Sequence, residues 1–195
     1  MVEGAPNSDE MKAAASKRTA FMAAIPQAVL DAEDALPRIL RELNASSRSK
    51  LQRVYLVANE LSAIRAPFVA CGKGCASCCH MNVSITRTEA ERIAKASGRR
   101  MSDVAASRRH ATDRHVGSPC PFLGEGGACS IYEDRPLSCR KHASFFEDAS
   151  ACAPSVMNAV EVPQVAFSGL DQALFAVSGG ERAVLADIRD FFPRG

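Results

Sequence analysis

Half of the cysteines in this sequence fall within nine residues, in the stretch CGKGCASCC from Cys71 to Cys79. Cys75 and Cys78 are separated by two residues, a spacing at which a turn directs two thiolates to one metal ion while backbone amides donate to the sulfurs. Thiolates favour zinc, Cu(I) and iron–sulfur centres over magnesium or calcium. The stretch therefore predicts a metal site.

The adjacent cysteines Cys78 and Cys79 limit how such a site is built. Side chains of neighbouring residues diverge by about 100° in a helix and point to opposite faces of a strand. The two thiols are therefore poorly placed to bind one ion together. Three arrangements remain open: the two thiols serve two nearby centres, they bind two irons of one cluster, or only one of them is a ligand.

Three further cysteines follow in compact phrases: Cys120 in CPFL, Cys129 in CSIYE and Cys139 in RPLSCR. Seven thiols exceed the four ligands of one tetrahedral site, so we expect either one cluster with spare thiols or two centres close together. The predicted metal ligands are Cys71, Cys75, Cys78, Cys79, Cys120, Cys129 and Cys139. Because little else anchors the chain between Cys79 and Cys120, loss of the metal should unfold this segment.

Three other residues are weaker candidates for the ligand set. Cys152 lies outside the compact phrases, and a buried or free thiol explains it as well as a ligand does. His80 and His142 each follow a cysteine closely and would complete a site of three cysteines and one histidine, although a surface or supporting role is the more common use of such a histidine.

The residues around the downstream cysteines are expected to support the site. Arg135 and Arg140 are predicted to offset the negative charge of several thiolates, and Glu133 to orient Arg135 through a salt bridge. An apolar shell would keep water from the sulfurs. This shell is predicted to contain Phe122, Leu123, Ile131 and Tyr132.

The first three cysteines also have the C-x3-C-x2-C spacing of radical SAM enzymes, and Gly179-Gly180-Glu181 matches a motif of that superfamily. However, Ser77 stands where those enzymes usually have an aromatic residue. Their barrel is built from βα units of about 30 residues or more each. The chain after Cys79 is too short for that barrel and lacks alternating strand and helix patterns. The radical SAM class is therefore disfavoured.

The whole cysteine string, with its IYE-x-RP phrase, resembles the CxxCxxCC (YkgJ-like) family of zinc- or iron-chelating cysteine-cluster proteins, from Cys71 to Cys152. The resemblance implies a bacterial, cytosolic domain that binds a zinc ion or an iron–sulfur cluster and whose biochemical role is unassigned. A flagellin lysine methylase carries a similar cluster, so the resemblance also implies a link to iron–sulfur-dependent protein modification.

Composition and the lack of certain sequence features limit which binding partners and which cellular location are expected. The 195 residues are 47% hydrophobic and carry a net charge of only +2, which gives no strong signal for nucleic-acid or membrane-surface binding. The N-terminus lacks the apolar stretch of a signal peptide, and no apolar run is long enough to span a membrane. We therefore expect a cytoplasmic location, where disulfides are rare and clustered cysteines bind metals or act as redox thiols.

Neither catalysis nor its absence is established by the motifs. The sequence has no Gly-rich phosphate loop, no GxSxG turn and no HExxH, and no catalytic residue is predicted. One hypothesis is a structural or regulatory metal module that presents its helices to a protein partner. A second is an iron–sulfur protein that handles electrons or supports a modification reaction, and a third is metal storage.

The elements that must position these residues are predicted to be mainly α, a helical scaffold around an irregular cysteine-rich core with short strands. Helices are expected over 28–43 with a kink or break at Pro37, and over 46–66 with Ser46 or Ser47 as the cap. Another is expected over 90–97, with a Thr86/Glu89 capping box and a Gly98 stop. Further helices are expected over 102–115, 172–177 and 181–192, and a strand over 81–85.

Three regions follow from this pattern. Residues 1–66 form an N-terminal helical region of which about the first 20 residues are flexible. Residues 67–152 form the cysteine-cluster domain. Residues 153–195 form a C-terminal helical region that packs on it.

Overall fold

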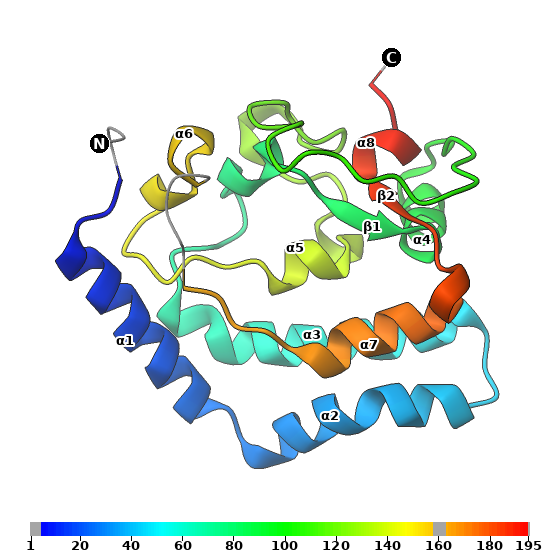
Figure 1. Cartoon of the computed structure of the whole chain (residues 1–195), viewed down its shortest axis with the longest axis horizontal. Coiled ribbons are helices and arrows are strands. Elements are labelled where there is room, and N and C mark those ends of the chain that lie inside the picture. Colours follow the sequence, from blue (N-terminus) through cyan, green and yellow to red (C-terminus); the bar gives the residue numbers. More distant parts are fainter. Residues whose placement is uncertain (1–4, 158–162, 195) are drawn as a thin grey trace.

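Residues 5–157 and 163–194 are described by a computed structural model, shown in Figure 1. The helices are α1 (Ser8–Ala24), α2 (Gln27–Glu42), α3 (Ser47–Arg65), α4 (Arg87–Ser97), α5 (Leu137–Lys141), α6 (Pro154–Met157), α7 (Ser168–Val177) and α8 (Ile188–Phe191). The strands are β1 (Ser84–Thr86) and β2 (Leu185–Asp187). The expected mainly helical fold with short strands and a cysteine-rich region is confirmed.

The long helices form one side of the molecule, and the cysteine segment with the small sheet forms the other (Figure 1). α7 packs along α2 and against α3, and α3 in turn packs against α5 of the cysteine segment. One buried apolar cluster, which includes Phe21, Leu51 and Tyr55, lies among these helices. A second cluster, which includes Ile85 and Phe122, surrounds the sheet.

The predicted helix caps of α3 and α4 are confirmed. The Ser46 side chain accepts a hydrogen bond from the Ser49 amide at the start of α3. Thr86 and Glu89 form a capping box at the start of α4, and Gly98 ends that helix with a φ of 69°. These signals act over three or four residues, so they operate without help from the rest of the fold.

The first helix departs from the predicted flexible N-terminus. α1 begins at Ser8, where Asn7 and Glu10 form a capping box, and it buries Phe21. The Phe21 ring lies 5.9 Å from that of Phe145 and 6.3 Å from that of Phe167. Tertiary packing of one aromatic side chain therefore holds a helix in an alanine- and charge-rich stretch. Residues 1–4, which the same prediction covers, lie outside the described residues.

Of the predicted kink or break at Pro37, the break is not found, because α2 continues through it to Glu42. Proline lacks the N–H that would bond to the carbonyl of Glu33, four residues earlier. The start of α7 packs against this carbonyl: a Cβ built on Gly169 would lie 2.2 Å from the Glu33 oxygen. The buried Glu33 carboxylate also accepts a 2.7 Å hydrogen bond from the Leu170 amide. Contacts with α7 therefore stabilise the helix where its own bond is missing.

The small sheet replaces part of two predicted elements. β1 and β2 pair antiparallel, with Ile85 opposite Ala186. The strand is thus shorter than the predicted 81–85 and begins later, and the predicted helix over 181–192 is confirmed only for α8. The two strands are about a hundred residues apart in the chain, so their pairing leaves no local signal.

The predicted helix over 102–115 is wrong, because that segment follows an irregular path with turns. Two of its backbone amides bond to the C-terminal segment, and within the segment the Arg114 amide closes only a turn on the Ala111 carbonyl. The Ser102 amide donates to the Phe191 carbonyl at 2.7 Å, and the Arg108 amide donates to the Leu185 carbonyl at 2.8 Å. Hydrogen bonds to distant backbone groups therefore form in place of those of a local helix.

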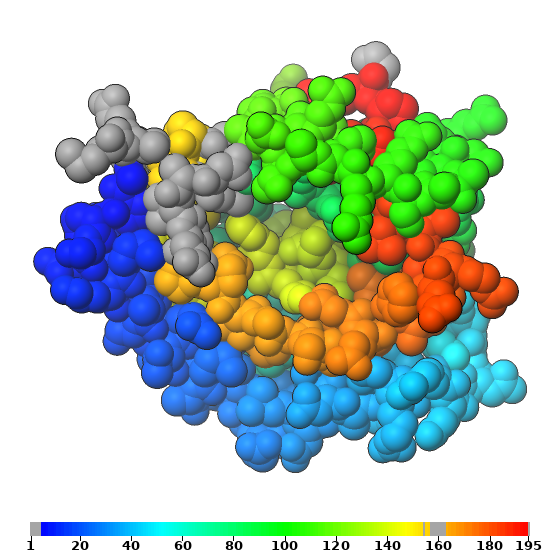
Figure 2. Space-filling view, in the orientation of Figure 1, coloured from blue at the N-terminus to red at the C-terminus, as the bar shows by residue number. Residues whose placement is uncertain are grey.

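Two further facts concern the surface. A hollow of about 410 Å³ is visible in Figure 2 where α5 lies behind α7, and its lining includes Lys141, His142, Asp171 and Leu185. Lys141 and Asp171 form an ion pair at the edge of this hollow.

None of the helices in the described ranges is both long and apolar enough to cross a membrane.

Candidate metal centre

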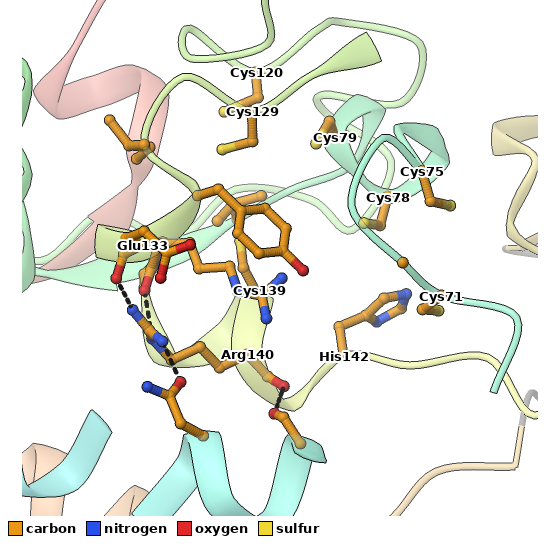
Figure 3. Close-up of a pocket in the computed structure, with 18 of the residues that line it drawn as sticks. Cys71, Cys75, Cys78, Cys79, Cys120, Cys129, Glu133, Cys139, Arg140 and His142 are labelled. Atoms are coloured by element: carbon orange, nitrogen blue, oxygen red, sulfur yellow. Dashed lines mark hydrogen bonds between the residues drawn. The ribbon is translucent and has the colours of Figure 1, made fainter. Parts of the chain in front are cut away.

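Seven of the eight cysteines line one cavity of about 410 Å³ (Figure 3). They are the seven predicted ligands: Cys71, Cys75, Cys78, Cys79, Cys120, Cys129 and Cys139. The remaining wall comes from α3 and from the segment around α5, and includes Asn59, Arg65, Tyr132, Glu133, Arg135 and His142. The structure thus brings together thiols that are widely separated in the sequence. Coordination of a metal by them stays a prediction.

The first cysteine stretch is a chain of tight turns fastened to the segment that follows α5. The Ala70 amide donates to the Ser144 carbonyl at 3.2 Å, and the Ser144 amide donates to the Cys71 Sγ at 3.1 Å. The Cys75 amide closes a turn on the Gly72 carbonyl at 3.1 Å. A short 3-10 helix, η2 (Ser77–His80), then carries the adjacent pair of cysteines.

The downstream cysteines are positioned by a small hairpin and by α5. The Cys120 amide donates to the Cys79 carbonyl at 2.7 Å, which joins the two stretches directly. Leu123 and Cys129 then form an antiparallel bridge, which places Cys129 close to Cys120 (Figure 3). Cys139 lies in α5, which begins after Pro136. Of the predicted apolar shell, Ile131 and Tyr132 line the cavity, whereas Phe122 and Leu123 belong to the cluster around the sheet.

Burial and mutual repulsion keep several of the thiols protonated in the metal-free protein. Burial raises the pKa of Cys120 to about 11, with further contributions from the charges of Cys79 and Cys129. Burial, followed by the charges of Cys120, Cys79 and Cys129, also raises the pKa of Cys139. Thiolate ligands are stable here only with a compensating positive charge, which a metal ion supplies.

The Cys78–Cys79 pair behaves differently from the other thiols. The hydrogen bond that the Cys78 thiol donates to the Cys79 sulfur lowers the pKa of Cys79 to about 7, and the charge of Arg189 acts in the same direction. The same hydrogen bond, together with burial, raises the pKa of Cys78. One thiolate is therefore already accessible at neutral pH.

Three arginines place positive charge around the thiols. The charge of Arg135 lowers the pKa of Cys129 and Cys139 against the effect of burial, in line with its predicted role. Its guanidinium lies 4.1 Å from the Tyr132 ring centroid, and its Nε is buried without a hydrogen-bond partner. The others are Arg65, which acts on Cys71, and Arg189, which acts on Cys79 and Cys120.

Arg140 does not have the predicted role at the thiols. Its Nε donates to the Arg135 carbonyl at 2.8 Å and its Nη2 to the Glu133 carbonyl at 2.5 Å, while Nη1 bonds to the Asn59 side chain. Its guanidinium also lies 4.2 Å from the Tyr55 ring centroid. Arg140 therefore fastens the cysteine segment to α3. The predicted ion pair between Glu133 and Arg135 is not found among the described residues.

The three weaker ligand candidates differ in their surroundings. His142 lines the thiol cavity, and its Nε2 is buried without a hydrogen-bond partner. Burial, then the charge of Arg65, lowers the pKa of His142, so the neutral imidazole is favoured. His80 turns back toward the Ala76 carbonyl at 3.2 Å. Cys152 is buried near Cys71 and Cys75, whose charges contribute to raising its pKa after burial itself.

The sequence pattern did not indicate Arg189 and did not distinguish His142 from His80. Arg189 lies in α8, and its side chain donates to the Cys79 carbonyl at 3.3 Å and to the Ser118 carbonyl at 2.6 Å. Its distance in the chain from the cysteines leaves no local signal. For His142 the signal is its closeness to Cys139, which does not distinguish it from His80.

The residues that line the cavity fit zinc or iron by the chemistry of their donors. Seven cysteines and a histidine whose Nε2 is buried without a partner line one space, and thiols and imidazoles are the ligand types that such metals prefer. Within residues 5–157 and 163–194, no three cysteine, histidine or acidic side chains yet converge closely enough to hold an ion. Coordination therefore requires the side chains to turn inward, as expected where metal binding and local folding are coupled.

Comparisons with known proteins agree with this chemistry. The model of the CxxCxxCC family, described as "Putative zinc- or iron-chelating domain", matches residues 70–155. No curated protein and no solved structure matches the chain. The matched range contains all eight cysteines and every segment that lines the thiol side of the cavity. Residues 70–155 of this chain therefore match the CxxCxxCC family, which is described as zinc- or iron-chelating.

Proposed function

We propose that the chain binds zinc or iron through the thiols of the cavity, and that the bound metal holds the cysteine segment together as a structural or regulatory module. The observation that carries this proposal is that seven thiols from separate parts of the sequence line one cavity. Clustered cysteines of this kind are typical of metal binding or redox chemistry and of few other functions.

The backbone of the cysteine segment supports a structural role for the metal. Between Gly98 and Ile131 the chain contains a single 3-10 turn, Glu125–Gly127, and one isolated bridge as regular structure. Few repeating hydrogen bonds therefore stabilise this stretch. A metal that joins Cys120 and Cys129 of this stretch to the first cysteine stretch would supply much of its folding free energy, as in small structural zinc domains.

A second candidate is an iron–sulfur protein that takes part in a modification reaction. The cavity extends beyond the thiols to Asn59, Tyr132 and Glu133. Its volume of about 410 Å³ falls within the range of roughly 300–1,000 Å³ that is typical of small-molecule sites. A cluster bound by the thiols would then lie beside a space that accepts a substrate or a cosubstrate.

The surroundings of the protein follow from the same chemistry. We propose a cytoplasmic location, because reduced thiols are maintained there and none of the eight cysteines is paired. We also propose that the module acts through a protein partner, which its helical side would contact. Affinity capture from lysate with the metal-loaded chain, compared with the metal-free chain, tests this: equal recovery of every protein would contradict a regulatory role.

Metal content per chain is the decisive measurement. The protein would be purified without oxygen and without added metal, and zinc, iron and acid-labile sulfide would be quantified. Zinc without iron supports the structural module, and iron with matching sulfide supports the second candidate. Neither metal, together with failure of the reduced chain to bind added zinc or iron, overturns metal binding altogether.

A further inference from the structure

The cysteines that line the cavity fall into two sets by their packing. Cys120 is buried in the apolar cluster around the sheet, and Cys79, Cys129 and Cys139 pack against that cluster. Cys71, Cys75 and Cys78 belong to neither apolar cluster. In Figure 3, Cys120 and Cys129 lie together at one end of the cavity and Cys71, Cys75 and Cys78 lie toward the other, with Cys79 between the two groups.

Backbone hydrogen bonds hold each set separately. In the first set, the Cys120 amide donates a hydrogen bond to the Cys79 carbonyl, and the hairpin that follows Cys120 carries Cys129. In the second set, the Ser144 amide donates to the Cys71 sulfur. Ser144 is only two residues beyond His142, so the segment that holds Cys71 also holds the imidazole.

We propose that the cavity holds two metal centres divided at the Cys78–Cys79 peptide bond, with Cys79, Cys120, Cys129 and Cys139 as the ligands of one and Cys71, Cys75, Cys78 and His142 as the ligands of the other. This inference rests on the proposed function, since it assigns the ligands of the same metal-binding cavity. Each set supplies four ligands, either four thiolates or three thiolates and one imidazole, and both are common tetrahedral sets.

Three observations support the assignment. Neighbouring side chains diverge, so dividing Cys78 from Cys79 gives each a centre that it can reach. Cys79, Cys120, Cys129 and Cys139 share the apolar cluster around the sheet, which does not include the other three cysteines of the cavity. The two sets also have different hydrogen-bond neighbours: Arg189 donates to the Cys79 carbonyl in the first set, and the Ser144 amide donates to the Cys71 sulfur in the second.

His142 is assigned in preference to Cys152 as the fourth ligand of the second centre. His142 lines the cavity, and its Nε2 is buried without a partner, which is costly unless a ligand satisfies it. Cys152 is not among the residues that line the cavity, and its sulfur already has the Ser144 hydroxyl as a hydrogen-bond partner.

Metal stoichiometry of the full chain and of matched variants tests the division. The metal-free, reduced protein would be titrated with zinc and with cobalt(II), and bound metal counted after gel filtration. We expect two metals per wild-type chain, and one per chain for both Cys129→Ser and Cys75→Ser. Circular dichroism would verify that each variant retains its helices. Cys152→Ser and His80→Ala serve as controls that keep two metals, and His142→Ala should lose or weaken one.

Each other result has a definite meaning. One metal per wild-type chain that both cysteine variants abolish indicates a single shared centre, which overturns the division and leaves the proposed function intact. One metal that only Cys129→Ser abolishes overturns the second centre. Loss of a metal in Cys152→Ser but not in His142→Ala overturns the assignment of the histidine. No metal in the wild-type chain overturns the proposed function itself. The wild-type count by itself separates two centres from one centre and from none, so a variant that fails to fold does not prevent a decision on the division.

Discussion

Replacing Gly169 with alanine tests how the helical scaffold beneath the cavity is assembled. The added Cβ would lie 2.2 Å from the Glu33 carbonyl oxygen and 2.8 Å from a Glu33 carboxylate oxygen, whereas Cβ contacts below 3.0 Å are essentially absent from proteins. The first of these atoms belongs to the backbone of α2, so it cannot swing aside. α7 must therefore move away from α2, which breaks or lengthens the bond between Leu170 and Glu33.

The expected magnitude follows from two costs. Overpacking typically costs about 1–3 kcal/mol, and a buried amide that loses its partner costs about 1–3 kcal/mol more. Because the two share one movement of α7, we expect a total of about 2–4 kcal/mol for Gly169→Ala. At roughly 2–4 °C per kcal/mol for a chain of this size, Tm should fall by at least about 4 °C.

Thermal unfolding followed by circular dichroism measures this effect. Gly72→Ala is the matched control, because its added Cβ meets no atom within 4 Å and its φ is not left-handed. That variant should stay within about 0.5 kcal/mol of the wild type. If Gly169→Ala unfolds within about 1 °C of the wild type, the close contact between α7 and the carbonyl exposed by Pro37 is not present in solution.

Three further predictions concern the buried charges and the metal. Burial, and then the charge of Asp34, raises the pKa of Glu33 above 4.5, although the hydrogen bond from Leu170 acts in the opposite direction. The stability that the protonated group contributes below about pH 4.5 is therefore lost as pH rises through the folded-state pKa. The Tm of Glu33→Gln relative to that of the wild type should increase from pH 4 to pH 7.5, and a constant difference would contradict this. Arg140→Met should lower the free energy of unfolding, measured in urea, by about 2–4 kcal/mol, because it leaves buried carbonyls unpaired. The control Arg53→Met, at an exposed position, should lower it by about 0.5 kcal/mol or less. Equal effects would refute the inference that Arg140 fastens the cysteine segment to α3. Chelation under reducing conditions should abolish hydrogen-exchange protection in residues 98–131 and spare α2 and α3; unchanged protection would show that the metal does not order this segment.

The pattern of successes and failures in the fold has a simple physical basis. The Ser46 cap, the Thr86/Glu89 box and the Gly98 stop are confirmed because each depends on bonds between residues three or four apart. The predicted helix over 102–115 fails because its amides bond to a segment at the other end of the chain. A helical pattern states what a segment can form locally and does not reveal a competing distant partner.

The sequence by itself determined the chemistry open to this protein: the number and type of its candidate thiol ligands, the class of metal that thiolates prefer and the difficulty of placing Cys78 and Cys79 on one ion. Only the tertiary structure decided which thiols pack against the same apolar cluster, that His142 lines the cavity and has a buried nitrogen without a partner, and that Arg189 lies near Cys79. The physical reason is that ligand preference belongs to each side chain. Grouping, burial and charge compensation depend instead on contacts between segments that only the folded chain brings together.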